Sequence, residues 1–325
     1  MTPSKSNDLS AVPLPLVRLC FRLSARGRWR LPEFAGDHLK RRLETALRNL
    51  DHRDHRLSGE GQVWAYLLRS QNLPGERAAA AGKQAPNPLT MRPQLDGPTS
   101  FKAGDCFEFD AMLIGHAAEL WRPLIEGVAW MAERGLGQGR ECAPLDLLDV
   151  TQRGCAEPWI ESLLGRDGPS LQRPEPEIMA PPPVPDAVTV RLLTPVIIRS
   201  LDAEGQRRVC RPEHLSFDLW LNSLLRRVRD LAHLHAGQMV ELGLPEQPER
   251  LMRASRLLWQ PGLRPPTSKQ GAQPFGGVIG WMRLAGPELR QVWPALWLGQ
   301  WLALGNGCTM GFGRYRLERS WVSEG

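Results

Sequence analysis

Histidines are the side chains in this sequence best suited to moving a proton near neutral pH. The chain has seven, at positions 38, 52, 55, 116, 214, 233 and 235. His38 is the leading candidate because it stands beside Lys40 and Arg41 in the expected first turn of a helix, where a proton-transfer group would have cations next to it. His116, which follows a strand-like run, comes next. An exposed helix-start histidine with no chemical role would give the same pattern at position 38.

Two glycine-rich segments follow expected helices, RGLGQGR (134–140) and GNGCTMGFGRYRL (305–317). A glycine costs roughly 0.5–1 kcal/mol more than alanine to order. A helix C-cap with a tight turn explains one or two glycines in each segment. The alternative is a cradle in which backbone N–H groups approach a phosphodiester. The cradle hypothesis assigns nucleic-acid contacts to Arg134, Gly137, Gly139, Arg140, Gly307, Gly311, Gly313 and Arg314.

Neither segment fits a familiar nucleotide motif. The sequence has no GxxxxGK[ST] run, and each segment connects a leading helix to a following strand, which is the reverse of a P-loop or a Rossmann turn. Binding of phosphate at a helix N-terminus is therefore not what these segments predict.

The basic residues point to a polyanionic partner. The net charge is +6, and only five of the 41 basic residues are lysines, so 36 are arginines. Arginine forks bidentately onto phosphate and stacks on bases, which makes nucleic acid the first partner to consider. A GC-rich genome would also favour arginine over lysine, whatever the function.

Cysteine spacing and hydropathy predict a cytoplasmic protein with no metal and no cofactor. The six cysteines stand singly, without a CxxC pair, which argues against a zinc site and a disulfide framework. No window approaches 18 uncharged apolar residues, and the N-terminus has no apolar signal core. We expect no contact with a membrane.

The first half of the chain has the pattern strand, helix, strand, helix, glycine segment, strand. Alternating residues 16–25 predict a strand, and residues 31–50 carry the apolar stripe of a helix with Asp37 as its N-cap. Residues 104–115 predict a strand and residues 116–135 a helix. The run VWAYLLRS (63–70), which lies between the first expected helix and the strand at 104–115, resembles a strand.

The second half opens and ends in the same way, after a proline-rich stretch that ends in PPPVPD. We therefore predict an α+β protein of two tandem ferredoxin-like (RRM-like, βαββαβ) domains with glycine-rich loops. The expected boundaries are 1–153 for the N-terminal domain, 154–186 for the linker and 187–325 for the C-terminal domain.

Four quoted motifs together resemble one known family. TVRLLTPVIIRS, PFGGVIGWMRLAG and the terminal LGNGCTMGFGRYRL are similar to the C-terminal domain of the CRISPR-associated RAMP endoribonucleases that cut precursor CRISPR RNA, the Cas-six family. In the first half, LPEFAGDHLKRRLETALRNL resembles the first helix of that family. The likeness covers nearly the whole chain, residues 16–316. The family's cysteine cluster after the first helix is missing, because DHRDHRLSGEG stands there.

The resemblance implies metal-independent cleavage, in which a 2′-hydroxyl attacks the neighbouring phosphate and leaves a 2′,3′-cyclic phosphate and a 5′-hydroxyl. It supports His38 as general acid or base, because the family often places its catalytic histidine in the first turn of this helix. We expect Lys40 to steady the phosphorane, and His116 is the next candidate if His38 is not catalytic. The implied partners are CRISPR repeat RNA and a CRISPR effector complex, for a monomer or homodimer. The main alternative is a non-catalytic RAMP subunit that binds and retains CRISPR RNA, and a basic adaptor protein is a third.

Overall fold

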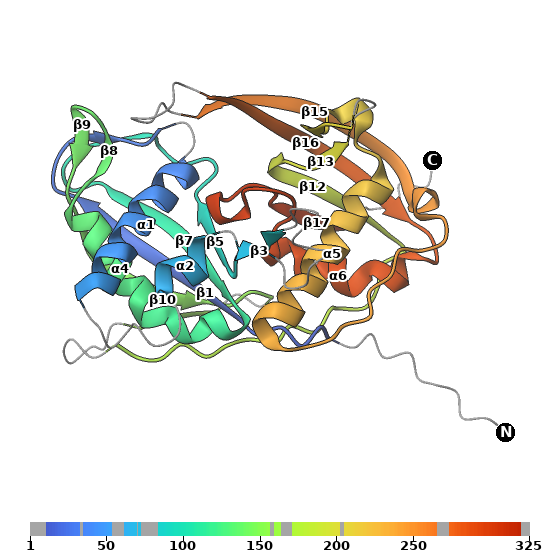
Figure 1. Cartoon of the computed structure of the whole chain (residues 1–325), viewed down its shortest axis with the longest axis horizontal. Helices are drawn as coiled ribbons and strands as arrows, with labels where there is room; N and C mark the ends of the chain where they lie inside the picture. Colours follow the sequence, from blue (N-terminus) through green and yellow to red (C-terminus); the bar gives the residue numbers. More distant parts are fainter. Residues whose placement is uncertain are drawn as a thin grey trace.

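The protein consists of two antiparallel sheets that lie side by side, each with helices packed on one face (Figure 1). The structure is a computed structural model and describes residues 11–32, 35–53, 62–69, 71–72, 84–156, 159–163, 171–201, 205–264 and 273–319. None of the helices in these ranges is long and apolar enough to cross a membrane. We call the elements within residues 16–162 the first unit and those within residues 187–319 the second unit.

The first unit has the βαββαβ order of a ferredoxin-like domain. Its main elements are β1(Leu16–Ala25), α1(Ala35–Arg53), β5(Leu89–Pro93), β7(Cys106–Ile114), α4(Trp121–Glu133) and β10(Leu145–Arg153). The sheet order is β11-β10-β1-β7-β5, so β1 lies between β10 and β7. Along β1, Val17, Leu19 and Phe21 are buried in the core of this unit, whereas Arg18 and Arg22 alternate with them on the opposite face.

The second unit repeats this topology. Its elements are β12(Ala187–Val196), α5(Phe217–Ala236), β15(Met252–Arg264), β16(Gln273–Ala285), α6(Leu289–Leu302) and β17(Tyr315–Arg319). The sheet order is β15-β16-β12-β17, which places the first strand between the third and the fourth, as in the first unit. The prediction of two tandem ferredoxin-like domains is therefore confirmed.

Short elements complete the structure. Small ladders join β2(Trp29–Arg30) to β6(Ser100–Phe101), β3(Gln71–Asn72) to β4(Gln84–Ala85), β8(Leu136–Gln138) to β9(Glu141–Ala143), and β13(Arg199–Leu201) to β14(Arg207–Val209). The edge strand β11(Ile160–Ser162) and the helix α2(Val63–Leu68) belong to the first unit. The 3-10 turns are η2(Gly115–Leu120), η3(Pro212–His214), η4(Pro248–Leu251) and η5(Cys308–Met310).

Two local predictions were wrong. The run VWAYLLRS contains the helix α2, in which Val63, Leu67 and Leu68 are buried at helical spacing in the core that α1 shares. Asp37 is not the N-cap, because α1 already begins at Ala35; it lies in the first turn and its carboxylate pairs with Arg41 at 3.1 Å. The first error is one of element type and the second one of helix start, and both depend here on tertiary packing.

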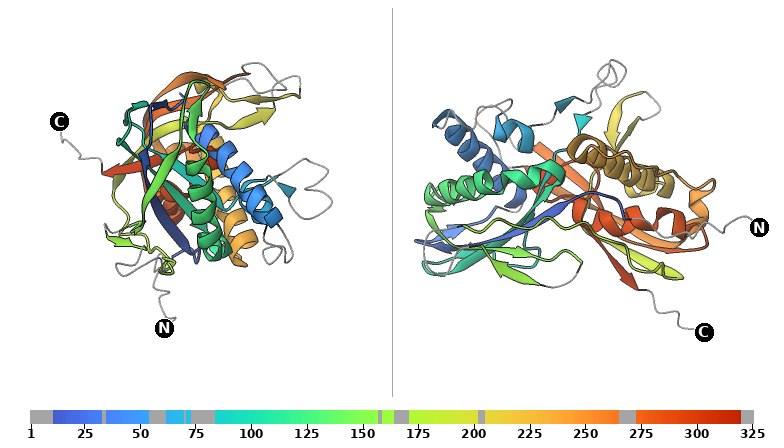
Figure 2. Two further views of the ribbon diagram at one scale, coloured as in Figure 1. Left: turned by 90° about the vertical axis from the view of Figure 1, so that its left-hand side faces the viewer. Right: turned by 90° about the horizontal axis from the view of Figure 1, so that it is seen from below.

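The range 154–186, which we expected to be a linker, has structure of its own. Residues 160–162 form β11 against β10, and the backbone of Glu177 pairs with Leu16 of β1. The following proline-rich strap, residues 171–186, runs along the side of both units to β12 (Figure 2). The indole Nε1 of Trp293 on α6 donates to the carbonyl of Pro182 at 2.7 Å, which ties the strap to the second unit.

His235 joins the two units. It lies in the last turn of α5 and is 7% exposed. Its Nδ1 lies 3.0 Å from the hydroxyl of Tyr66 on α2, and its Nε2 lies 2.8 Å from the carbonyl oxygen of Pro86, both in the first unit. With both ring nitrogens occupied, His235 and Tyr66 form a structural contact between the units.

Candidate functional site

The first turn of α1 lies between the two glycine segments, which come from different units. We call residues 134–140 the first glycine segment and residues 305–314 the second. The backbone N–H of Gly137 donates to Nε2 of His38 at 3.1 Å. On the other side, a Cβ atom at Gly36 would stand 1.8 Å from the carbonyl oxygen of Met310, so the helix backbone contacts the second segment directly. The structure therefore brings His38 and both segments to one junction.

His38 is buried and neutral at this junction. It is 6% exposed. Burial, with smaller contributions from the charges of Arg42 and Arg41, lowers the pKa of His38 to about 4. Because Nε2 accepts a hydrogen bond from Gly137, the proton of the neutral ring lies on Nδ1. At neutral pH the ring can accept a proton, but only after the Gly137 contact opens.

The cations beside His38 are tied to carboxylates along the helix. Lys40 lies 3.9 Å from Glu44, and Arg41 lies 3.1 Å from Asp37, both at i,i+4 spacing. Lys40 and Arg41 are partly exposed, with side-chain exposures of 24% and 37%. They can reorient toward an anion at the cost of these pairs, which are weak at a solvated surface.

The other histidines lie away from this junction. His116 is exposed on η2, which packs against α5 at the end of the first unit where His235 lies. His52 is exposed near the end of α1, and His214 and His233 are exposed in the second unit. His55 lies outside the described residues. The structure does not bring His116 together with His38, so the two are separate candidates rather than a pair.

The first glycine segment is a hairpin with a solvent-exposed tip. Gly137 has φ 112°, and a Cβ atom there would lie 2.1 Å from the carbonyl oxygen of Glu141, so only glycine fits. Gly139 at the tip has φ 55° and open space around it, and Arg140 next to it is exposed. The guanidinium of Arg134 stacks on Trp130 at 4.3 Å. Arg140 is thus the arginine of this segment that faces solvent without a ring contact.

The second glycine segment is packed inside the protein. We expected a turn to explain one or two of its glycines, but all four have positive φ, and three would place a Cβ within 2.8 Å of a backbone carbonyl oxygen. These three are Gly305 against Ile197, Gly311 against Met91, and Gly313 against Leu304. Internal packing therefore accounts for the glycines without a ligand.

Most amides in and next to the second glycine segment already have partners. The backbone N–H groups of Leu304, Asn306, Met310, Gly311, Phe312, Gly313 and Arg314 all donate to oxygens of the protein. Gly313 donates to Pro195 at 3.0 Å and Gly311 to Cys308 at 2.9 Å. RNA contact by Gly311 and Gly313 stays a prediction, and it requires the segment to change shape.

Arg314 links the second glycine segment to the first unit. Its Nη1 donates to the carbonyl oxygen of Pro93 at the end of β5, at 3.0 Å, and the side chain is half-buried. Burial lowers its pKa from the ordinary value. The two arginines that follow the last glycine of each segment thus differ in place: Arg140 faces solvent, and Arg314 lies between the units.

Sequence reasoning missed a basic row on the second sheet. In the strand register, Arg256 of β15 lies opposite Trp281 of β16, Trp281 opposite Arg191 of β12, and Arg191 opposite Arg316 of β17. Trp281 is half-buried, whereas Val278 and Met282 of the same strand are buried in the core. Alternation along each strand was the available signal, but the register that aligns four strands is a property of the fold.

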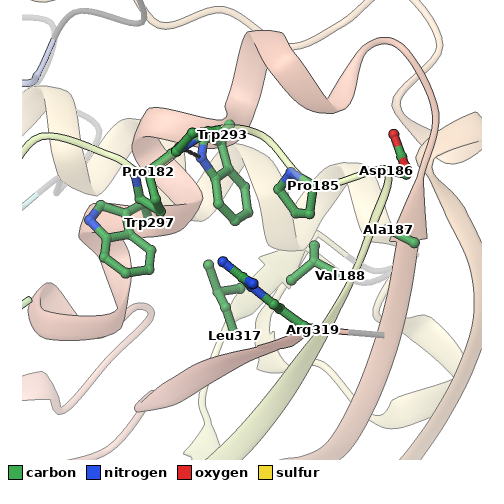
Figure 3. A pocket seen from close by; sticks show the side chains of 10 residues that line it. Pro182, Pro185, Asp186, Ala187, Val188, Trp293, Trp297, Leu317 and Arg319 are labelled. Carbon is green, nitrogen blue, oxygen red and sulfur yellow. Dashed lines mark hydrogen bonds between the residues drawn. The ribbon is translucent and has the colours of Figure 1, made fainter. Parts of the chain in front are cut away.

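A pocket of about 550 Å³ lies elsewhere, between the strap, α6 and β17 (Figure 3). The indoles of Trp293 and Trp297 line it, with prolines of the strap on one side and Leu317 and Arg319 on another. No residue of α1 or of either glycine segment lines it. This pocket lies where the strap packs on α6, and it is separate from the junction at His38.

Metal ligation has no candidate cluster in the described ranges. Within them, no group of three or more His, Cys, Asp or Glu side chains is close enough to hold an ion. The prediction of a metal-free site remains a prediction.

Comparison with known proteins gives two matches to family models. The family model of the CRISPR-associated endoribonuclease Cas6 matches residues 190–315, and a model of an N-terminal domain matches residues 14–177. No curated protein matches the sequence. A solved Cas6 product complex is 14% identical with a TM-score of 0.53, over 94% of this chain and 100% of that one. A partial Cas6-RT-Cas1–Cas2 complex is 15% identical with a TM-score of 0.54, over 95% of this chain and 47% of that one.

The two structural likenesses support the fold over nearly the whole length, and the Cas6 family model covers the second unit together with its glycine segment. Of the motifs that carry the family resemblance, PFGGVIGWMRLAG lies within residues 190–315, TVRLLTPVIIRS and the terminal LGNGCTMGFGRYRL overlap that range, and the first-helix motif lies outside it. Residues 190–315 match the Cas6 family of CRISPR-associated endoribonucleases, and these findings together support a Cas6-family CRISPR RNA processing protein.

Proposed function

We propose that this protein cuts CRISPR precursor RNA within its repeats, without a metal ion, leaving a 2′,3′-cyclic phosphate and a 5′-hydroxyl. The observation that carries the proposal is the junction at which His38, in the first turn of α1, lies between the two glycine segments. Family membership supplies the class of reaction. The position of His38 supplies the group that would move a proton.

In this mechanism the 2′-hydroxyl of one nucleotide attacks the adjacent phosphorus. The 2′-oxygen loses its proton to a base, the bond from phosphorus to the 5′-oxygen breaks, and that oxygen leaves with a proton. Neutral His38 accepts the proton of the 2′-hydroxyl through Nε2, and the partly exposed Lys40 and Arg41 stabilise the charge on the phosphorane. The reaction needs only proton transfer and charge stabilisation.

One step in this mechanism is specific to this chain. Nε2 of His38 accepts the Gly137 amide in the free protein, so RNA has to displace the hairpin before Nε2 can act. Active-site hydrogen bonds commonly rearrange between the free and the bound enzyme. We infer that binding of RNA at the first glycine segment and exposure of His38 are one event.

The same observation favours a second candidate. His38 is buried, its pKa is low and its Nε2 already accepts a hydrogen bond, and these are the properties of a histidine with a structural role. A Cas6-family protein that binds and retains processed CRISPR RNA without cutting it would have the same fold and the same junction. The two candidates differ only in whether His38 gains access to the RNA.

The proposed partners are CRISPR repeat RNA and a CRISPR effector complex. One solved structure is a Cas6 product complex, and another is a partial Cas6-RT-Cas1–Cas2 complex. The basic row from Arg256 to Arg316 gives an RNA strand a further surface next to the second glycine segment.

The test is incubation of the protein with the repeat RNA of its own locus in EDTA, under single-turnover conditions. We expect the wild type to cut once per repeat and to leave a cyclic phosphate. His38→Ala should bind RNA nearly normally and cut about 10²–10⁴-fold more slowly, because a positioned proton-transfer group contributes that much. Lys40→Ala should show a smaller loss.

His116→Ala is the matched control, because His116 is an exposed histidine remote from the junction. It should cut at the wild-type rate. If His38→Ala cuts normally and His116→Ala does not, the catalytic role belongs to His116. If the wild type binds the repeat and fails to cut it, the retention function replaces the endonuclease.

A further inference from the structure

A cluster of charged side chains lies where the edge strand β5 of the first sheet meets the end of the second glycine segment at Arg314, on the face of the first sheet that is turned away from its helices. Its guanidinium groups are those of Arg18, Arg92, Arg153 and Arg314, and its carboxylates are those of Glu108, Asp110 and Glu177. These groups come from β1, β5, β7, β10, the strap and the start of β17. Positive charge exceeds negative charge in the cluster.

The carboxylates are already engaged by other groups. Arg92 stands directly opposite Asp110 in the strand register, but Asp110 accepts Nε and Nη2 of Arg18 at 2.8 and 2.5 Å. Glu108 accepts Nη2 of Arg153 at 3.1 Å. The carboxylate of Glu177 accepts the backbone N–H of Cys155 at 3.3 Å.

Arg92 and Arg314 are therefore left without an anionic partner. Within the described part of the chain, no carboxylate lies at ion-pair distance from either guanidinium. Nη2 of Arg92 reaches only the carbonyl oxygen of Gln300, at 3.5 Å, and its Nη1 is buried with no hydrogen bond. Arg314 donates through Nη1 to Pro93, and its Nε is buried with no hydrogen bond. Unsatisfied buried donors of charged groups cost stability.

The electrostatics agree with an unmatched positive charge. Burial first, and then the charges of Arg314 and Arg18, lower the pKa of Arg92 to about 9, and the charge of Asp110 opposes this only in part. Both residues are half-buried, so neither is completely sealed from solvent. A phosphate-type anion in contact with both guanidiniums would supply the missing negative charge and the missing acceptors.

We propose that Arg92 and Arg314 form a binding site for one phosphate-type anion between the two units. Planar guanidinium groups match the geometry of phosphate oxygens and bind them bidentately. The site adjoins the second glycine segment, because a Cβ atom at Gly311 would lie 2.8 Å from the carbonyl oxygen of Met91, next to Arg92. Such an anion would hold β5 and β17 together and stiffen the junction of the units.

A phosphate of bound RNA is one source of this anion. Arg316 follows Arg314 on the same face of β17, about 7 Å along the strand, and continues into the basic row of the second sheet. In this form the inference rests on the proposed function, since it needs RNA at the junction. Free inorganic phosphate is the other source, and it requires no RNA chemistry.

The first arm of the test measures thermal unfolding in inorganic phosphate against chloride at equal ionic strength. We expect phosphate to raise the unfolding temperature of the wild type by about 2–5 °C, because a ligand of the folded state stabilises it. Arg92→Gln and Arg314→Gln should each lose this shift. In chloride, Arg92→Gln should be at least as stable as the wild type, since an unmatched charge is removed. Arg290→Gln, at an exposed position on α6, should keep the shift.

The second arm measures binding of a single-stranded repeat RNA that carries a 2′-deoxy nucleotide at the cut, so that cleavage plays no part. If the RNA supplies the anion, Arg92→Gln should weaken binding and lower the slope of log affinity against log salt by about 0.7, as for one phosphate. A lost phosphate shift with an unchanged RNA slope would support the site with a free anion as its ligand. If neither readout changes in Arg92→Gln and Arg314→Gln, the site does not exist, whether or not the protein cuts RNA.

Discussion

The two glycine segments look alike in sequence and differ in structure. Both follow a helix and both place an arginine after their last glycine. The first is a hairpin whose tip, at Gly139 and Arg140, stands in open solvent. The second is packed between the units, and its four glycines contact Ile197, Phe312, Met91 and Leu304. A glycine-rich segment that ends in glycine followed by arginine is thus an exposed hairpin tip in one case and a packed segment between the units in the other.

The difference separates two reasons for glycine that sequence cannot distinguish. At Gly139 the backbone needs positive φ alone, because no atom stands where a Cβ would be. At Gly313 positive φ is combined with a carbonyl oxygen 1.8 Å from the Cβ position. Only the exposed tip leaves its surroundings free for a ligand. Between the two lies α1, and its His38 is held by the hairpin rather than by the buried segment.

Alanine at the two glycines should give the largest contrast. Gly313→Ala should cost about 2–5 kcal/mol of unfolding free energy, because left-handed strain adds to a clash with the Leu304 carbonyl. Gly139→Ala should cost about 1 kcal/mol, from strain alone. Urea unfolding followed by circular dichroism measures both. Equal losses at the two positions would mean that the second segment is not packed as described.

The contact between His38 and the hairpin predicts a pH dependence of stability. The pKa of His38 is about 4 in the folded protein and about 6.5 in an unfolded chain, so the unfolded state binds more protons between these values. Stability from this group is therefore present above pH 6.5 and is lost as the pH falls toward 4. Between pH 7 and pH 4, the wild type should lose on the order of 2 kcal/mol more than His38→Gln.

His235 also has a lowered pKa and is intact in both proteins, so its effect cancels in this comparison. Unfolding curves at several pH values give the difference. Parallel curves for the wild type and His38→Gln would mean that His38 titrates near its ordinary pKa and that the hairpin does not bury it. Gly137→Ala, which removes the fit of the hairpin, should shift the pKa of His38 upward, as measured by NMR.

The fold was predictable because each main element carries its own period. Alternation along β1 and the apolar stripe of α1 depend on residues close in sequence, and the repeated order of elements then specified the topology. The run containing α2 was mistaken for a strand because a short apolar run has no clear period. Its helical spacing becomes meaningful only once Val63 and Leu67 pack in the core of the first unit.

The site was less predictable because its contacts are distant in sequence. The amide of Gly137 and Nε2 of His38 are 99 residues apart, and Tyr66 and His235 are 169 residues apart. The type of residue suggested His38, but only the fold places it under the hairpin. The destination of Arg314, at the carbonyl of Pro93, likewise depends on how the two sheets meet.

The smallest expected effect is at the exposed tip, with Arg140→Gln. Arg140 makes no ion pair in the described structure and is exposed, so the substitution should change unfolding free energy by no more than about 0.5 kcal/mol. If the tip contacts an RNA phosphate, binding of the uncleavable repeat should weaken a few-fold, and the salt slope should fall by about 0.7. Arg314→Gln should change RNA binding and phosphate-dependent stability together, because that side chain also joins the units. Fluorescence anisotropy over a salt series separates the two arginines. An unchanged slope in Arg140→Gln would remove the first glycine segment from the RNA path and leave Gly137 with a structural role beside His38.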